Sequence, residues 1–255
     1  MEIKDKIAVI TGGASGLGAA TAERLHGMGA KILIMDMNKA KGEELCHTLR
    51  TNVVFAHTNV TETIQVQAAI NLAMEKFGKI DICVNCAGTG MAMKIVGRDG
   101  PHDLNTFIRI LMINLVGTFD TARLAAYHMQ NNEPNEDGER GVIINTASVA
   151  AWDGQIGQAA YSASKGGIVS MTLTIARDMA RSGVRCCTIA PGLFDTPLMA
   201  IMPEEQKLAL GAQVPFPKRL GRAVEFAMMA QQIIENSYLN GETIRLDGAI
   251  RMAPR

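Results

Sequence analysis

The sequence carries no excess charge of either sign, no long uncharged apolar run and no recognisable leader in its first residues. Its 255 residues include 25 Lys and Arg against 25 Asp and Glu, so the formal net charge is zero. Nucleic acids and anionic membranes attract proteins through a basic face, so we expect neither as a main partner. No uncharged apolar run approaches the roughly 18 residues that span a bilayer, and residues 1–7 resemble neither a secretory signal nor a transit peptide. We therefore expect a globular, cytoplasmic protein whose 47% of hydrophobic residues build its core.

Cysteine occurs in an odd number and in no arrangement that indicates a disulfide framework. Two of the five cysteines, Cys83 and Cys86, have the spacing of a zinc or redox pair. They lie at the end of an apolar run of strand character, however, and residues an odd number apart on a strand point to opposite faces. No second pair of cysteines or histidines supplies further ligands. We therefore predict no metal, and buried reduced thiols that pack as small apolar groups.

Short β-branched runs alternate with longer amphipathic stretches along the whole chain. Strands that alternate with helices of this length form βαβ units, whose strands are parallel and whose helices cover both faces of the sheet. No linker or change in composition divides the chain. We therefore predict an α/β fold, a single domain over residues 1–255 with a Rossmann-type doubly wound parallel sheet of about seven strands. The predicted strands are residues 6–11, 31–36, 52–57, 80–85, 141–147, 184–190 and 242–246, and the predicted helices are residues 15–28, 38–50, 62–77, 105–130, 159–181 and 222–235.

One long stretch breaks the alternation of strands and helices. Residues 191–220 hold five of the eight prolines, interspersed with apolar side chains such as Leu193 and Phe194. An irregular stretch of this length inside a compact domain is usually functional. We predict that residues 193–220 form a lid over an apolar substrate, with packing on a neighbouring subunit as the alternative.

The turn after the first predicted strand, Thr11-Gly-Gly-Ala-Ser-Gly-Leu-Gly18, leads directly into the first predicted helix. Backbone amides at a helix N-terminus, with no side chain at Gly12, Gly16 and Gly18, form a cradle for a pyrophosphate. The second predicted strand ends at Asp36, where a carboxylate accepts the hydroxyls of an adenosine ribose and repels a 2′-phosphate. Met37, rather than an arginine, follows. The pattern therefore favours NAD over NADP.

Tyr161 and Lys165 lie four residues apart on a predicted helix and so share one face. A phenol needs its pKa lowered by about three units to act as a base near neutral pH. An ammonium about 4 Å away supplies roughly that much at an effective dielectric of 20. We therefore predict that Tyr161 exchanges a proton with an alcohol or carbonyl, and that Lys165 lowers its pKa. Ser148, at the end of the fifth strand, would hold the substrate oxygen, the alternative being a helix-capping serine.

Taken together, these residues resemble the short-chain dehydrogenase/reductase superfamily over essentially the whole chain. The matching elements are the glycine motif at residues 11–18, Asn85-Cys-Ala-Gly88, Asn114, Ser148, Tyr161-x-x-x-Lys165, and Pro191-Gly192 before Thr196. The resemblance implies that Ser148, Tyr161 and Lys165 are catalytic, that Asn114 completes a proton relay through water, and that Gln158 lies beside the substrate with Ser148 and Tyr161. It also implies a homotetramer. The implied cofactor-binding residues are Gly12, Ser15, Gly16, Leu17, Gly18, Asp36, Asn59, Val60, Cys86, Ala87, Gly88, Tyr161, Lys165, Pro191, Gly192, Phe194 and Thr196.

Within the superfamily, longer stretches such as residues 141–151, 157–169 and 244–252 are similar to the type 2 3-hydroxyacyl-CoA dehydrogenases. This similarity implies an NAD-dependent oxidation of a 3-hydroxyacyl-CoA to a 3-ketoacyl-CoA, as part of fatty acid metabolism. The apolar lid also suits a steroid-like substrate, so a hydroxysteroid dehydrogenase is an alternative. An NADPH-dependent 3-ketoacyl-thioester reductase is another, disfavoured by Asp36. A catalytically idle scaffold for assembly or RNA binding is an alternative of a different class.

The sequence departs from the family pattern at two places. Asn59 stands where the family usually has an aspartate that contacts adenine, and because an amide still offers a donor and an acceptor we expect weaker or altered adenine contact without loss of binding. The loop over residues 94–104 also differs, so we carry no contact with CoA over to it. Relatives work in mitochondria, which makes the mitochondrial matrix the alternative to the cytoplasm.

Overall fold

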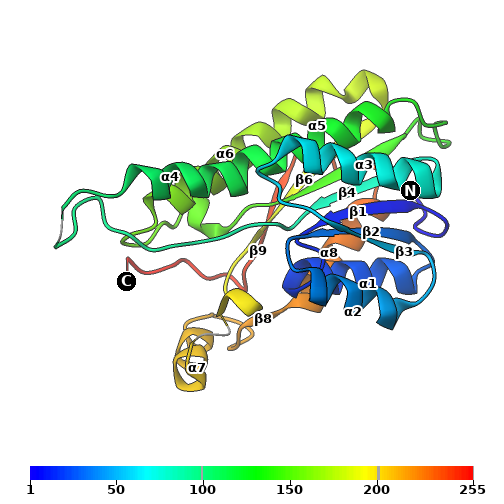
Figure 1. The fold of residues 1–255 in the computed structure, drawn as a ribbon. Coiled ribbons are helices and arrows are strands. Elements are labelled where there is room, and N and C mark those ends of the chain that lie inside the picture. The colour runs from blue at the N-terminus through cyan, green and yellow to red at the C-terminus, as the bar shows by residue number, and fades with distance from the viewer. Residues whose placement is uncertain (99, 200–201, 255) are drawn as a thin grey trace.

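The computed structural model describes residues 1–98, 100–199 and 202–254. Seven parallel strands form one sheet in the order β3-β2-β1-β4-β5-β6-β9, with the crossover between β1 and β4 near its middle (Figure 1). The fold predicted from the alternation of strands and helices is therefore confirmed. The strands are β1 (Ile7–Thr11), β2 (Lys31–Asp36), β3 (Val53–His57), β4 (Ile82–Asn85), β5 (Gly141–Thr146), β6 (Val184–Pro191) and β9 (Thr243–Leu246).

Two helical layers cover the sheet, because successive strand side chains point to opposite faces. Ala8 and Ile10 of β1 pack with α1, α2 and α8, whereas Val9 between them packs with α3, α5 and α6. These two groups of helices lie on opposite sides of the sheet in Figure 1. In the described part of the chain, no helix has both the length and the apolar character needed to cross a membrane. The helices of the two layers are α1 (Gly16–Gly27), α2 (Lys39–Leu49), α3 (Thr63–Phe77), α4 (Leu104–Leu111), α5 (Gly117–Met129), α6 (Ala159–Asp178) and α8 (Ala223–Glu235).

The helix predicted over residues 105–130 is continuous but not uniform. Between α4 and α5 the backbone widens into a π-helical turn, η1 (Met112–Val116). The hydroxyl of Thr118 donates to the backbone oxygen of Asn114 over 2.7 Å, and such back-bonding by threonine distorts a regular helix. Wide turns of this kind are frequent at functional sites, and this one carries Asn114.

The segment predicted as an irregular lid contains regular structure. Between the short paired strands β7 (Phe194–Asp195) and β8 (Gly221–Arg222), the chain forms a single helical turn, η4 (Pro197–Met199), and the helix α7 (Glu204–Ala212), which projects away from the sheet in Figure 1. Ala200 and Ile201, which belong to the predicted lid, lie outside the described residues. The sequence did not predict α7, because a short helix between prolines with Gly211 as its one buried residue has no apolar stripe.

Candidate active site

The carboxyl end of β1 leads into the glycine turn and then into α1. Gly12 and Gly16 have φ angles of +60° and +53°, a region that side chains strongly disfavour. A Cβ atom on Gly12 would also lie only 2.8 Å from the backbone nitrogen of Ala87. Ser15 is the N-cap of α1 but does not cap it through its side chain, and Leu17 packs on the core behind the turn. The backbone amides at the start of α1 are therefore not covered by side chains of the turn itself.

Asp36 ties the end of β2 to this turn. Its Oδ2 accepts a hydrogen bond from the amide of Ala14 over 3.0 Å, and its Oδ1 accepts one from the amide of Asn38 over 2.9 Å. A carboxylate offers about four acceptor positions, so two remain for hydroxyl groups of a ligand. The structure thus places Asp36 beside the glycine turn, as its position after the second strand predicts.

Asn59 and Val60 follow β3 along the same edge of the sheet. The Asn59 Oδ1 accepts hydrogen bonds from the Thr61 amide over 3.1 Å and from the Thr61 hydroxyl over 2.9 Å. Val60 is buried against Gly117 at the start of α5, where an added Cβ would lie 2.9 Å from it. The acceptor atom of Asn59 is therefore already used locally, and its amide nitrogen is the group left to face a base.

The segment after β4 is bonded to the end of β1, where the glycine turn begins. The amides of Cys86 and Ala87 donate to the backbone oxygen and the hydroxyl of Thr11, both over 3.1 Å. Cys86 packs on the side of α1 and Cys83 on the opposite side of the sheet, which confirms the predicted opposite orientation of the two thiols. Burial raises the pKa of Cys86 to about 12, so this group is a neutral thiol at physiological pH.

Ser148, Tyr161 and Lys165 converge at the carboxyl end of β5. Ser148 interacts with the Tyr161 side chain, and its Oγ accepts a hydrogen bond from the Ala150 amide over 3.2 Å, so it also caps the short helix η2 (Val149–Ala151). The buried Lys165 ammonium donates to the backbone oxygen of Thr146 over 2.7 Å and lies 5.7 Å from the centre of the Tyr161 ring. The spacing of Tyr161 and Lys165 thus brings the two side chains to one place.

The prediction that Lys165 lowers the pKa of Tyr161 is wrong. Burial raises the pKa of Tyr161, and the interaction with Ser148 only partly opposes this. Burial also lowers the pKa of Lys165 to about 8. Removal from water favours the neutral form of both groups, and the ammonium is directed to the Thr146 carbonyl instead of the phenol. Ser148, not Lys165, is therefore the side chain that lowers the Tyr161 pKa here.

Asn114 is fully buried and holds two segments of the site together. Its Oδ1 accepts from the Thr89 amide over 2.8 Å, and its Nδ2 donates to the Thr89 carbonyl over 2.9 Å and to the Ser164 hydroxyl over 3.0 Å. A side chain on Gly88 would start 3.4 Å from Asn114 Oδ1 and 3.6 Å from Lys165 Nζ. Asn114 and Lys165 therefore both approach Gly88, and the relay of Asn114 through water stays a prediction.

Sequence reasoning missed three residues that this arrangement uses. Thr146 receives the Lys165 ammonium through its backbone carbonyl, and Thr89 and Ser164 hold the Asn114 amide. Thr146 is the last residue of β5, and the carboxyl end of a parallel strand is a position that could have indicated a role in the site. Nothing local distinguishes the other two, because their partners lie far away in the sequence.

The remaining predicted contacts lie where β6 passes into the lid. Pro191 ends β6, and a side chain on Gly192 would start 2.8 Å from the Asp247 Cβ. A side chain on Gly16 would start 3.7 Å from the Thr196 Cβ, so the first stem of the lid reaches the glycine turn. The Phe194 ring instead turns into the base of the lid, against Gly221. If Phe194 contacts the cofactor, it does so through its backbone and not through its ring, and this contact stays a prediction.

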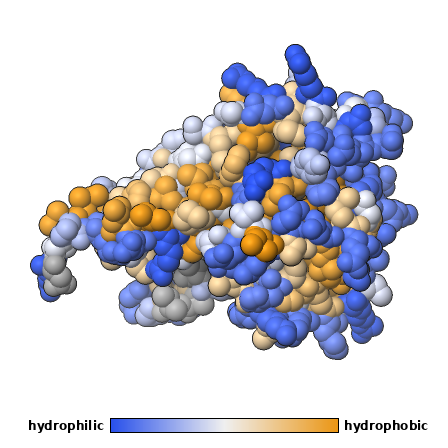
Figure 2. Space-filling view, turned by 45° about the horizontal axis from the view of Figure 1, so that its top comes forward, coloured by the Kyte–Doolittle hydropathy of each residue, from blue (hydrophilic) through white to orange (hydrophobic). Residues whose placement is uncertain are grey.

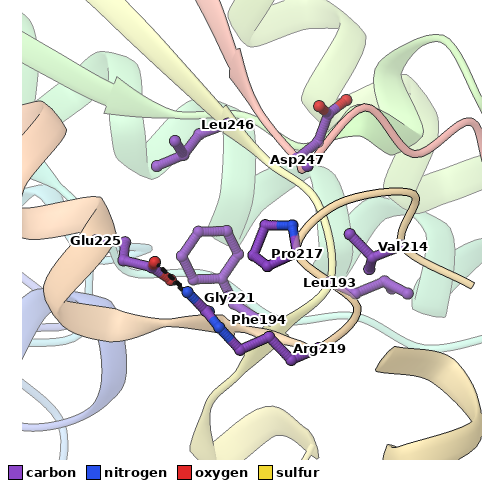
Figure 3. A pocket seen from close by; sticks show the side chains of 10 residues that line it. Leu193, Phe194, Val214, Pro217, Arg219, Gly221, Glu225, Leu246 and Asp247 are labelled. Carbon is purple, nitrogen blue, oxygen red and sulfur yellow. Dashed lines mark hydrogen bonds and ion pairs between the residues drawn. The ribbon is translucent and has the colours of Figure 1, made fainter. Parts of the chain in front are cut away.

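A cavity of about 130 Å³ lies at this base, between the lid and the end of β9 (Figure 3). Figure 3 shows the Phe194 and Pro217 rings at its centre and the Arg219–Glu225 ion pair at its edge. Arg219 lowers the pKa of Glu225 to about 2 and fixes the second stem of the lid to α8. Tyr161 does not line this cavity, so we assign the cavity to residues 193–220, the predicted lid, and not to the site around Tyr161.

Gln158 directly precedes α6, three residues before Tyr161. Its Oε1 accepts from the Gln155 amide over 3.1 Å, and its Nε2 donates to the Gln155 Oε1 over 3.4 Å. The preceding turn also approaches the segment after β4, because the Met93 amide donates to the Gly157 carbonyl over 2.9 Å. Gln158 thus lies directly before α6, after a turn that approaches the segment following β4, and its contact with a substrate stays a prediction.

This chain is similar over nearly its full length to known dehydrogenases. The family model for short chain dehydrogenases matches residues 6–207. The 3-hydroxyacyl-CoA dehydrogenase type-2 of Homo sapiens is 57% identical over 254 residues, covering 99% of this chain and 97% of that protein, and the Drosophila melanogaster protein of the same name is 54% identical, covering 99% and 100%. A crystal structure of 3-hydroxyacyl-CoA dehydrogenase type-2 from Mycobacterium avium, 43% identical, superposes with a TM-score of 0.94 and covers 100% of this chain and 98% of its own. A 3-ketoacyl-(acyl-carrier-protein) reductase from Brucella melitensis, complexed with NADH and 28% identical, has a TM-score of 0.86 with coverage of 98% and 100%.

Proposed function

This chain belongs to the short-chain dehydrogenase family, and we propose that it catalyses the NAD-dependent interconversion of 3-hydroxyacyl-CoA and 3-ketoacyl-CoA. The observation that carries the proposal is the convergence of Ser148, Tyr161 and Lys165 at the carboxyl end of β5, where Lys165 lies close to the segment that contacts the glycine turn. The names of relatives 54–57% identical over nearly the full chain support the substrate class. A scaffold without activity would have no need of this convergence.

The cofactor is a nicotinamide dinucleotide, and we propose that it is NAD. The backbone amides at the start of α1 fit a pyrophosphate, and Gly12 and Gly16 leave room that a side chain would fill. Asp36 would accept the adenosine ribose hydroxyls and repel a 2′-phosphate, while Thr196 would hold the nicotinamide carboxamide. When bound, NAD accepts or returns a hydride.

The protein's own contribution is the position and movement of one proton. Tyr161 would donate its phenolic proton to the forming alcohol oxygen during ketone reduction, and the raised pKa keeps that proton in place at neutral pH. During oxidation the phenolate would receive the alcohol proton, and rising pH favours this direction. Ser148 would orient the substrate oxygen beside Tyr161, and Lys165, held by Thr146, would bind the ribose hydroxyls next to the reacting ring.

We propose that residues 193–220 close over the acyl part of the substrate. Leu208 of α7 is 69% exposed, and Gly211 is the one buried residue of that helix. A short helix with so little packing needs a partner to stabilise it. The base of this segment is fixed, because β7 pairs with β8 and Gly221 donates to the Leu193 carbonyl over 2.8 Å. Closure would therefore move α7 while β7 and β8, at the two ends of the segment, stay in place.

Turnover of acetoacetyl-CoA with NADH, compared with NADPH, tests the proposal. We expect kcat/KM to favour NADH by about tenfold or more, since a charge-assisted contact contributes about 1.5–3 kcal/mol. A preference for NADPH would indicate a reductase of the biosynthetic type. Turnover of a hydroxysteroid with none of acetoacetyl-CoA would indicate the steroid alternative, and absence of turnover with any of these would contradict the proposal.

We also propose that copies of this chain cover the exposed face of α4 and α5 and form a homotetramer. Large apolar side chains recur there at helical spacing, and Figure 2 shows apolar residues gathered on this face. They are Leu104, Ile108, Val116, Phe119 and Tyr127, between 42% and 67% exposed. Light scattering after size-exclusion chromatography should give four times the chain mass of 27.3 kDa. Phe119→Asp should give a smaller species, and a wild-type monomer would contradict the proposal.

The compartment remains a prediction, the cytoplasm or, as for relatives, the mitochondrial matrix. Subcellular fractionation followed by detection of the chain with an antibody tests it.

A further inference from the structure

We propose that the C-terminal residues 247–254, here called the strap, position the turn at residues 152–158, here called the mouth loop, and that Gln155 transmits this position to Gln158. Gln155 and Asp153 are then positioning residues that determine how tightly substrate binds without taking part in the proton transfer. The inference rests on the proposed function, because Gln158 is expected to lie beside the substrate.

Hydrogen bonds join the end of the strap to the middle of the mouth loop. The amide of Ile156 donates to the Pro254 carbonyl over 3.0 Å, and the Gln155 Nε2 donates to the Ala253 carbonyl over 2.9 Å. Neighbouring residues of one segment thus bond to neighbouring residues of the other. Nearly a hundred residues separate the two segments, so these contacts exist only in the folded chain.

Arg245, near the end of β9, connects the two segments a second time. Its Nη2 forms an ion pair with Asp153 over 2.6 Å, and its Nε contacts the Asp247 carboxylate over 2.8 Å. The Nη2 also donates to the Ile250 carbonyl over 3.0 Å. The guanidinium lies 5.2 Å from the centre of the Trp152 ring, where a cation is attracted to the aromatic face.

These ion pairs are held mostly away from water. The side chains of Arg245 and Asp153 are 21% and 13% exposed. Arg245 lowers the pKa of Asp153, so the carboxylate stays charged at physiological pH. Charge-assisted hydrogen bonds of this kind are stronger than neutral ones. The start of the mouth loop is therefore fixed to β9 while its middle is fixed to the strap.

The side-chain amide of Gln155 contacts both the strap and Gln158, the residue predicted to lie beside the substrate. The Gln155 Nε2 faces the strap, whereas its Oε1 accepts from the Gln158 Nε2 over 3.4 Å and its backbone amide donates to the Gln158 Oε1 over 3.1 Å. A shift of the strap would thus move the Gln155 side chain and remove its contact with the Gln158 Nε2, which leaves the Gln158 side chain held by the Gln155 backbone amide alone. Tyr161 lies one helical turn further on, in regular helix, so its proton transfer should be spared.

Two substitutions of Gln155 separate these contacts. Gln155→Ala removes both side-chain contacts, whereas Gln155→Glu keeps the acceptor for Gln158 and loses the donor to Ala253. Asp153→Asn weakens the ion pair from the opposite end of the loop. Gln130→Ala is the matched control, because this exposed glutamine bonds only to the neighbouring Tyr127 carbonyl.

The experiment measures kcat and KM for acetoacetyl-CoA, KM for NADH, and hydrogen exchange of the amides at residues 152–160 in each full-length variant. We expect all three loop variants to raise KM for acetoacetyl-CoA about threefold to tenfold, the range for loss of one hydrogen bond, with kcat and KM for NADH near wild type. Exchange at residues 152–158 should become faster. The control should change none of these.

Several results would overturn the inference. If Gln155→Glu keeps the wild-type KM, the contact with the strap does not affect substrate binding. If hydrogen exchange is unchanged in all variants, the contacts of Arg245 and of the strap do not hold the mouth loop in place. A joint fall of kcat, NADH affinity and melting temperature would mean that the contacts serve only general stability. If the wild type itself does not turn over acetoacetyl-CoA, the proposed function is wrong, while hydrogen exchange still tests whether these contacts hold the mouth loop.

Discussion

The ammonium of Lys165 lies 5.7 Å from the centre of the Tyr161 ring but donates its hydrogen bond to the backbone carbonyl of Thr146. The two side chains share one crevice without forming a phenolate–ammonium pair. Burial keeps both groups closer to neutral than their spacing along a helix suggests. The phenol is therefore neutral in the resting site. Under the proposed function we expect it to give its proton to a ketone, and the reverse reaction to need higher pH.

Replacing Tyr161 by phenylalanine should remove turnover and retain cofactor binding. The substitution deletes only the phenolic oxygen, so kcat for acetoacetyl-CoA should fall about a thousandfold, within the usual range for a general acid. Fluorescence titration should give an NADH Kd close to wild type. Tyr238→Phe, at a tyrosine that is 98% exposed, is the control and should behave as wild type. Near-normal turnover of Tyr161→Phe would refute the role of the phenol.

Replacing Ser148 by alanine should shift the pH profile as well as the rate. Ser148 lowers the pKa of Tyr161 against the larger effect of burial, so its removal should raise that pKa further. For alcohol oxidation, the rising limb of log kcat/KM against pH should then move to higher pH, and kcat should fall about a hundredfold. A lower rate with an unmoved pH limb would mean that Ser148 orients the substrate but leaves the phenol unaffected.

Replacing Lys165 by methionine should increase stability while it abolishes activity. The folded-state pKa of about 8 is below the unfolded value of about 10.4, so below pH 8 the folded protein bears the full cost of a buried ammonium, about 3 kcal/mol. Between pH 8 and about 10.4 the folded state binds fewer protons, and wild-type stability rises with pH.

Chemical unfolding at several pH values measures this difference. The free energy of unfolding of Lys165→Met should exceed that of wild type by about 2 kcal/mol at pH 7, after loss of the hydrogen bond to Thr146, and the gap should close as the pH rises toward 10. Lys76→Met removes a lysine whose side chain is 50% exposed and should show no such dependence. A constant gap for Lys165→Met would contradict the lowered pKa.

Replacing Asn59 by aspartate should strengthen NADH binding. Asn59 Oδ1 already accepts two hydrogen bonds from Thr61, so a second carboxylate oxygen would add an acceptor for the adenine amino group. We expect the Kd for NADH to fall about threefold to tenfold, as for one added hydrogen bond. Calorimetric titration measures it, and an adenine-free nicotinamide mononucleotide should bind both proteins equally. An unchanged NADH Kd would show that Asn59 does not face adenine.

Much of the layered fold follows from local patterns. Asn38 begins one predicted helix, and its side chain caps that helix by accepting from the Lys41 amide. Gly78 directly follows another predicted helix, and it has the left-handed conformation that glycine adopts most readily. Such features depend on neighbouring residues alone. The helix α7 and the π-helical turn at Asn114 were not predicted, because the one lacks an apolar stripe and the other depends on a hydrogen bond inside a helix.

What the sequence determined by itself is the order of strands and helices, the glycine turn before Asp36, and the shared helix face of Tyr161 and Lys165, because each is a matter of residue type and short spacing. What only the tertiary structure decided is the direction of the Tyr161 pKa, the carbonyl that receives the Lys165 ammonium, and the contact of the last residues with Gln155. These depend on how much water is excluded and on which distant segment arrives beside a side chain, and neither quantity is encoded in local spacing.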